Sequence, residues 1–151
     1  MQDAPILICY DDTAGARHAI DTAATLFPGC SAVVLDVAPP LTVAESYAAL
    51  TAMTPDFEEL NTEDALSRAQ LGTDLARRKG LRAEARADAA NPTWDGVVEA
   101  ANDIDAAAIV IGSRGLTGAR EFLKGSVSHE VAEHAGRPVM IVPPVRNHQS
   151  S

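Results

Sequence analysis

At 151 residues, with 46% hydrophobic but only 4% aromatic residues, the chain is long enough for one domain with a core of small aliphatic side chains. A formal net charge of −9 and the scarcity of aromatic rings exclude the usual ways of binding nucleic acid. No apolar run approaches the roughly 18 residues of a membrane span, and the N-terminus carries no secretion signal, so we expect a soluble, cytoplasmic protein without a membrane partner. The two cysteines, Cys9 and Cys30, are too few for a disulfide framework.

The first half of the chain alternates short apolar runs with helical patterns. The expected elements are a strand at 5–10, a helix from Ala14 to a stop at Pro28, a strand at 32–37, a loop or short helix at 41–55, and a long helix at 56–79. Continuous apolar runs of this length are typical of strands buried on both faces. Two acids, Asp11 and Asp12, follow the first strand directly.

The second half continues the alternation. The expected elements are an edge strand at 82–87 with one solvated face, a helix from an Asn91 N-cap with Pro92 as its first residue to about 102, a strand at 107–111, a helix at 127–135 and a strand at 139–142. Strands that alternate with helices predict an α/β fold, with a parallel sheet and helices on both of its faces. We expect a single domain over 1–144 and a polar, disordered tail over 145–151.

A glycine-punctuated loop joins the strand at 107–111 to the helix at 127–135. It reads Gly112-Ser-Arg-Gly115-Leu-Thr-Gly118-Ala-Arg-Glu-Phe-Leu-Lys-Gly125-Ser126 and carries three basic residues against one acid. Glycines let backbone N–H groups approach an anion, and the start of a helix attracts negative charge. The loop is therefore a candidate phosphate site, although by itself the pattern fits a simple turn and N-cap equally well.

This loop, together with Asp11 and the second strand ending in Leu35-Asp-Val-Ala-Pro39, resembles the universal stress protein family. The nucleotide-binding members of that family carry Gly-x2-Gly-x9-Gly-(Ser/Thr), and the pattern is complete here. The resemblance implies an open five-stranded sheet of order 3-2-1-4-5, in the adenine nucleotide alpha hydrolase-like fold. In that order the loops after the first and fourth strands flank one crevice, which is where ligands of such sheets bind.

The resemblance also implies which residues bind. Asp11 would accept hydrogen bonds from the ribose, and the backbone of Val37 would meet the adenine edge. The phosphates would lie along the loop and the start of the next helix, at Gly112, Arg114, Gly115, Gly125, Ser126, Val127 and Ser128. The implied ligand is ATP, or else AMP, ADP or cyclic AMP, with Mg²⁺ a candidate companion of the phosphates.

Three functions stay open on the sequence alone. The leading one is a regulatory stress protein that binds adenine nucleotide, with no catalytic residue assigned because no acid and base are paired near the motif. The alternatives are a slow ATP hydrolase that uses Asp11 or Asp12, and a partner-binding protein that ignores nucleotide. No metal site is predicted, since His129 and His134 are five positions apart rather than the four of a zinc-binding helix.

A homodimer is expected as well. The strand at 139–142 is short, apolar and expected at the edge of the sheet, where unpaired backbone groups invite a partner. The resemblance implies that this strand pairs with its own copy across a two-fold axis.

Overall fold

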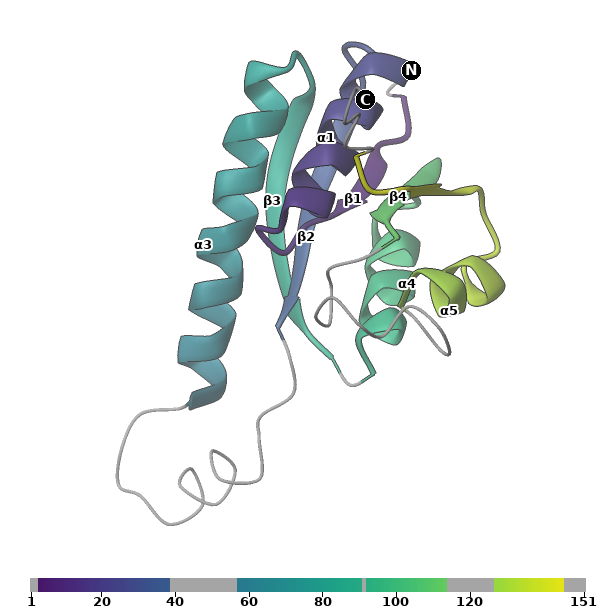
Figure 1. Cartoon of the computed structure of the whole chain (residues 1–151). Coiled ribbons are helices and arrows are strands. Elements are labelled where there is room, and N and C mark those ends of the chain that lie inside the picture. The colour runs from purple at the N-terminus through teal and green to yellow at the C-terminus, as the bar shows by residue number, and fades with distance from the viewer. Residues whose placement is uncertain (1–2, 39–56, 91, 114–126, 146–151) are drawn as a thin grey trace, which may run out of the picture.

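The structure is a computed structural model that describes residues 3–38, 57–90, 92–113 and 127–145. Its centre is one parallel sheet in the order β3-β2-β1-β4-β5 (Figure 1). The strands are β1 (Ile6–Cys9), β2 (Ser31–Ala38), β3 (Arg82–Ala89), β4 (Ala108–Gly112) and β5 (Val139–Val142). The predicted α/β class and the strand order 3-2-1-4-5 are confirmed.

Helices cover both faces of this sheet. They are α1 (Ala14–Leu26), α3 (Phe57–Arg78), α4 (Thr93–Asp103) and α5 (Val127–His134). Helices α1 and α3 share one hydrophobic core with the sheet, and α4 and α5 share the core on the other face. None of the helices in the described ranges is both long enough and apolar enough to cross a membrane.

The packing rests on small residues, as the aliphatic composition predicts. Helix α1 buries Ala16, Ala19, Ile20 and Ala23 at three- and four-residue spacing. This spacing places the four side chains on one stripe of the helix, against the sheet. Because three of the four are alanines, the helix backbone can lie close to the strands.

The start of α4 differs from the sequence expectation. The pair Asn91-Pro92 predicts an asparagine cap followed by a helical proline. In the structure Pro92 is itself the N-cap, with an extended backbone (φ −74°, ψ 161°), and no side chain caps the helix. The fixed φ of proline is compatible with either position, so the pattern could not separate them. Asn91 and the expected loop or short helix at 41–55 lie outside the described residues.

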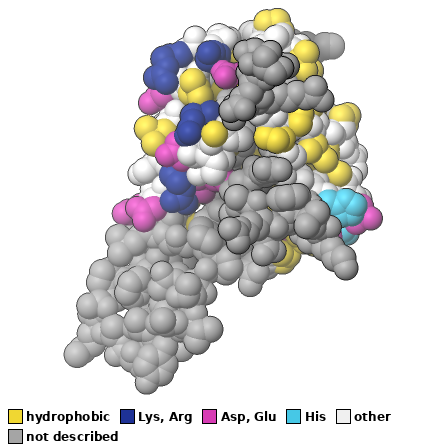
Figure 2. Space-filling view, in the orientation of Figure 1, with side chains coloured by type: hydrophobic (Ala, Val, Ile, Leu, Met, Phe, Trp, Pro, Cys, Tyr) yellow, Lys and Arg dark blue, Asp and Glu magenta, His cyan; other side chains and the backbone are white. Residues whose placement is uncertain are grey.

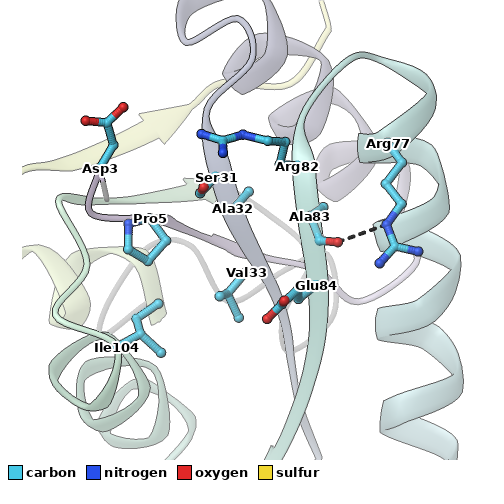
Figure 3. Close-up of a pocket in the computed structure, with 10 residues that line it drawn as sticks. All are labelled: Asp3, Pro5, Ser31, Ala32, Val33, Arg77, Arg82, Ala83, Glu84 and Ile104. Carbon is cyan, nitrogen blue, oxygen red and sulfur yellow. Dashed lines mark hydrogen bonds between the residues drawn. The ribbon is translucent and has the colours of Figure 1, made fainter. Parts of the chain in front are cut away.

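The two edges of the sheet are built differently. At the β3 edge, Arg77 of α3 donates from Nε to the carbonyl oxygen of Ala83 at 2.9 Å (Figure 3). The β5 edge is apolar, and Ile141 keeps 42% of its surface exposed. Figure 2 shows the same contrast: charged side chains are interleaved over α3, and hydrophobic ones gather over β5. The side chain of Arg77 thus occupies part of the β3 edge, whereas the side chains of β5 leave its edge uncharged.

Candidate functional site

The turn after β1 holds Asp11 at the carboxyl end of the sheet. Thr13 is the N-cap of α1, and its Oγ1 accepts a hydrogen bond from the backbone N–H of Ala16 at 3.2 Å. The Oδ1 atom of Asp11 accepts from the backbone N–H of Thr13 at 3.1 Å and from its hydroxyl at 2.6 Å. These bonds fix the carboxylate of Asp11 to the first turn of α1.

The second oxygen of Asp11 is unused. Oδ2 is buried and has no hydrogen-bond partner among the described residues. Burial raises the pKa of Asp11 above its ordinary value, although the bonds from Thr13 lower it. A buried acceptor without a donor is costly, so such an atom calls for an explanation. A hydroxyl or amine supplied by a bound molecule would satisfy it.

A second acid, Asp36, is buried beside this position. It lies in β2 with 2% of its surface exposed, and Arg68 of α3 donates to it from Nε (2.8 Å) and Nη2 (3.1 Å). Burial raises the pKa of Asp36 despite this guanidinium, and the charge of Asp36 in turn raises the pKa of Asp11. The sequence analysis missed this pair. Its one signal was a carboxylate inside an otherwise apolar strand.

The backbone of Val37 faces the same end of the sheet as Asp11. The carbonyl of Leu35 accepts a hydrogen bond from the N–H of Tyr10 at 2.8 Å, so the backbone groups of Leu35 face β1. Backbone direction alternates along a strand, and Val37 therefore faces the same side. Because β1 has already ended at Cys9, the N–H and C=O of Val37 project past its end. The side chain of Val37 packs in the core formed with α4 and α5.

The glycine loop begins and ends at this end of the sheet. β1 and β4 are direct neighbours, with Ile8 opposite Val110, so Asp11, after β1, and Gly112, the last residue of β4, lie at the carboxyl ends of adjacent strands. Gly112 is half-buried, α5 begins at Val127, and Ser128 is buried in its first turn. The other predicted loop residues, Arg114, Gly115, Gly125 and Ser126, lie outside the described residues.

A hollow of about 850 Å³ lies at the opposite, amino end of the strands (Figure 3). Its lining residues are Asp3, Pro5, Ser31, Ala32, Val33, Arg77, Arg82, Ala83, Glu84 and Ile104. Both of its arginines already donate from Nε to backbone carbonyls, Arg77 to Ala83 and Arg82 to Gly29. Because these two guanidinium groups are already bonded within the chain, the hollow is a weaker candidate than the carboxyl end of the sheet, where Asp11 keeps an unpartnered oxygen.

The histidines of α5 lie on the surface. Glu130, Glu133 and His134 bring their ligand atoms within 4.8 Å of one another, and the ring of His134 stacks on Trp94 at a centroid distance of 4.4 Å. His129 instead lies 3.9 Å from Glu133. Glu133 and His134 are exposed, and acidic groups in water commonly cluster without an ion, so we assign no metal site here.

Neither cysteine forms a disulfide. Cys9 lies in β1, where burial together with the charges of Asp11 and Asp36 raises the pKa of its thiol to about 12. A thiol with so high a pKa is protonated at neutral pH and is a poor nucleophile. Cys9 is therefore a small core residue rather than a reactive group.

Comparison with known proteins gives one family. The model of the universal stress protein family matches residues 4–143. The universal stress protein YxiE of Bacillus subtilis (strain 168) is 36% identical over 69 residues, a match that spans 46% of this chain and 46% of that protein.

Two solved structures share the fold over nearly the whole chain. A universal stress protein in complex with cAMP is 20% identical with a TM-score of 0.67, and the match covers 96% of this chain and 100% of that one. The universal stress protein from Archaeoglobus fulgidus in complex with dAMP is 24% identical with a TM-score of 0.60, covering 94% and 99%. Identities this low bear on the fold alone. The family match over residues 4–143 shows that the chain belongs to the universal stress protein family.

Proposed function

We propose that this protein binds an adenine nucleotide at the carboxyl end of the sheet, between the turn after β1 and the loop after β4, and that its role is regulatory. The observation that carries the proposal is the buried, unpartnered Oδ2 of Asp11 at the point where the strand order reverses. Such switch points are the usual ligand sites of open parallel sheets. Structural neighbours that hold cAMP and dAMP support an adenine nucleotide as the ligand.

The charges of the crevice favour one orientation of the ligand. Asp11 and the buried Asp36 repel phosphates, whereas the ribose carries hydroxyl donors that Oδ2 of Asp11 can accept. Adenine would meet the backbone of Val37. The phosphates would extend toward Gly112 and the start of α5, where Val127 and Ser128 offer the positive end of a helix. With ATP as the ligand, Mg²⁺ would accompany the phosphates rather than bind a site within the chain.

The loop residues outside the described ranges complete this proposal. Arg114, Gly115, Gly125 and Ser126 would supply backbone N–H groups and one guanidinium to the phosphates. We expect Gly115→Val to abolish nucleotide binding, because a branched side chain would fill the space through which the backbone approaches a phosphate. Gly118→Val is the matched control, since Gly118 lies in the same loop but outside the glycine pattern.

Titration calorimetry with ATP, ADP, AMP and cyclic AMP tests the proposal. The wild type and Gly118→Val should release heat on binding at least one of them, and Gly115→Val should not, with all three proteins unfolding at similar denaturant concentrations. Absence of heat from the wild type with every nucleotide would refute nucleotide binding. Equal affinities of the two glycine variants would refute the placement of the phosphates.

We also propose a homodimer formed through β5. The strand is at the edge of the sheet, is apolar, and exposes Ile141, whereas the opposite edge at β3 is partly capped by Arg77. Sedimentation at micromolar concentration should show a dimer for the wild type and a monomer for Ile141→Lys. Leu71→Lys on α3, where Leu71 is 55% exposed, is the control and should remain dimeric. A monomeric wild type would overturn this part of the proposal.

A further inference from the structure

The turn between β1 and α1 contains a residue with unusual backbone geometry. Asp12 has a φ of 62°, in the left-handed region that glycine adopts freely and other residues rarely do. Within the described ranges, the other non-glycine residue with positive φ is Asp105, at 50°, in the turn before β4. Non-glycine residues in this region persist when their surroundings hold them there, and they cluster at functional sites.

Two side chains hold Asp12 in this conformation. The hydroxyl of Tyr10 donates to Oδ1 of Asp12 at 2.8 Å. Nη1 of Arg17, from the first turns of α1, donates to the backbone carbonyl of Asp12 at 2.8 Å and to Oδ1 at 3.1 Å. The turn is therefore fastened to the residue before it and to the helix after it, on either side of the carboxylate of Asp11.

Tyr10 is itself fixed by packing. Its side chain is fully buried, and its ring lies so close to Gly72 of α3 that a Cβ atom there would come within 2.7 Å of Cδ1. Burial and the bond to Asp12 raise the pKa of Tyr10, so the hydroxyl stays protonated and able to donate. Packing against α3 thus fixes Tyr10, and Tyr10 in turn holds Asp12.

From these contacts we infer that Asp12 is a positioning residue for nucleotide binding. Because Tyr10 and Arg17 hold it, Asp12 sets the direction in which Asp11 presents its unpartnered oxygen to the ligand. The inference rests on the proposed nucleotide function. Asp12 makes no contact with the ligand in this account. It acts through Asp11, whose Oδ1 is bound to Thr13, so that the geometry of the turn decides where Oδ2 points.

A double-mutant cycle separates this role from a general loss of structure. Asp12→Gly introduces a residue that adopts positive φ freely, so the chain should fold. The substitution removes both hydrogen bonds to the Asp12 side chain. In the wild-type background we expect the affinity for the preferred nucleotide to fall about tenfold. The Asp11→Asn variant should bind the nucleotide more weakly, through the contacts to its phosphates. In that background, adding Asp12→Gly should alter the affinity less than about twofold.

Asp105→Gly is the matched control. It makes the same substitution at the same kind of backbone, at the exposed turn before β4, and should leave the affinity unchanged in both backgrounds. Equal losses from Asp12→Gly in the two backgrounds, or no loss in either, would overturn the positioning role. A wild type that binds no nucleotide would instead refute the proposed function, and with it this inference.

A second readout needs no nucleotide. The titration of the Asp11 carboxyl, followed by carbon NMR in the free protein, should move toward the ordinary pKa of an aspartate in Asp12→Gly, because a loosened turn lets the carboxylate reach water. The charge of Asp12 is not among the main causes of the raised pKa of Asp11, so the movement would report geometry. An unchanged titration of Asp11 in Asp12→Gly would contradict the claim that Asp12 positions the carboxylate of Asp11.

Discussion

The two ends of the sheet use polar groups in opposite ways. At the amino end, arginines donate to backbone carbonyls: Arg77 to Ala83, Arg82 to Gly29, and Arg137 to Ala101 in α4 and to Ala106 before β4. At the carboxyl end, Asp11 keeps a buried oxygen without a partner in the described structure, and Asp12 holds a left-handed backbone. The amino end is thus held by these arginine bonds, while the carboxyl end retains a buried oxygen without a hydrogen-bond partner. The other such atom in the described residues, Oδ1 of Asp21 in α1, lies 3.3 Å from the ammonium of Lys79.

If the proposed function holds, this difference separates residues that stabilise the fold from residues that serve a ligand. Groups whose hydrogen bonds are complete stabilise the native state, and their removal should cost stability. A group left incomplete costs stability in the free protein, and its removal should return some. The comparison therefore predicts opposite signs for substitutions at the two ends, which measurements of the free energy of unfolding can test.

The largest effect is expected from Arg137→Met at the amino end. Arg137 donates from Nη1 to the carbonyls of Ala101 (3.0 Å) and Ala106 (2.7 Å), and from Nη2 to Oδ1 of Asn102 (2.7 Å). It therefore ties the end of α4 to the approach to β4. Methionine fills similar space but donates nothing, so we expect the free energy of unfolding to fall by about 3 kcal/mol, because charged donors are lost and carbonyls are left unpaired.

Urea unfolding of Arg137→Met beside Arg82→Met checks this prediction. Arg82 makes an exposed bond from Nε to Gly29, so its replacement should cost less than about 0.5 kcal/mol. Equal losses of stability in the two variants would show that the bonds of Arg137 stabilise the fold no more than the single bond of Arg82. Arg137→Lys should recover little of the loss, because an ammonium cannot reach several acceptors with the fixed fork of a guanidinium.

A smaller loss is expected behind the candidate site, from Gly72→Ala. Alanine is favoured over glycine inside a helix by about 1 kcal/mol, so this change would stabilise an unconstrained α3. Here the new Cβ would lie 2.7 Å from Cδ1 of Tyr10, and we expect overpacking to reverse the sign, with a net loss of about 1 kcal/mol.

Thermal unfolding of Gly72→Ala, alone and combined with Tyr10→Leu, tests the cause of the loss. If the contact with the tyrosine ring is responsible, the glycine substitution should become neutral or stabilising once the ring is gone. A loss of the same size in both backgrounds would assign it to α3 itself and would remove the packing support that we ascribe to Tyr10.

The sequence predicted the architecture well because the signals for it are local. Apolar runs such as 107–111 and the helical spacing of Ala16, Ala19 and Ile20 depend on neighbours within a few residues, and the observed elements match them to within one or two positions. The strand order came from the family resemblance and is confirmed.

The site was harder to predict because its contacts are distant or conformational. The pair of Asp36 with Arg68 joins residues 32 positions apart, and no periodicity announces it. The left-handed turn at Asp12 could not be read from Asp11-Asp12-Thr13, since all three residue types are common in turns and caps. Asp11 was singled out by resemblance, and its free oxygen became visible only when the bonds from Thr13 were placed.

An effect no larger than that of Gly72→Ala, and of the opposite sign, is expected from Asp11→Asn. The asparagine keeps an oxygen for the bonds from Thr13 and replaces the buried, unpartnered Oδ2 by a neutral amide. We expect the free protein to become more stable by about 1 kcal/mol at pH 7, near the lower end of the penalty for a buried unpaired polar group, because the residue is only half-buried. The affinity for nucleotide should fall at the same time.

The pH dependence of that gain identifies its origin. The pKa of Asp11 is raised in the folded protein, so the folded state binds this proton more tightly than the unfolded chain does. The stability that protonation gives the wild type is present below the ordinary pKa of aspartate and is lost as the pH rises through the raised value. Urea unfolding should therefore show the advantage of Asp11→Asn growing across that window and levelling off above it. If the difference in unfolding free energy between Asp11→Asn and the wild type were constant at all pH values, the unpaired charge of Asp11 would not be its cause. The contrast between the two ends of the sheet would then fail.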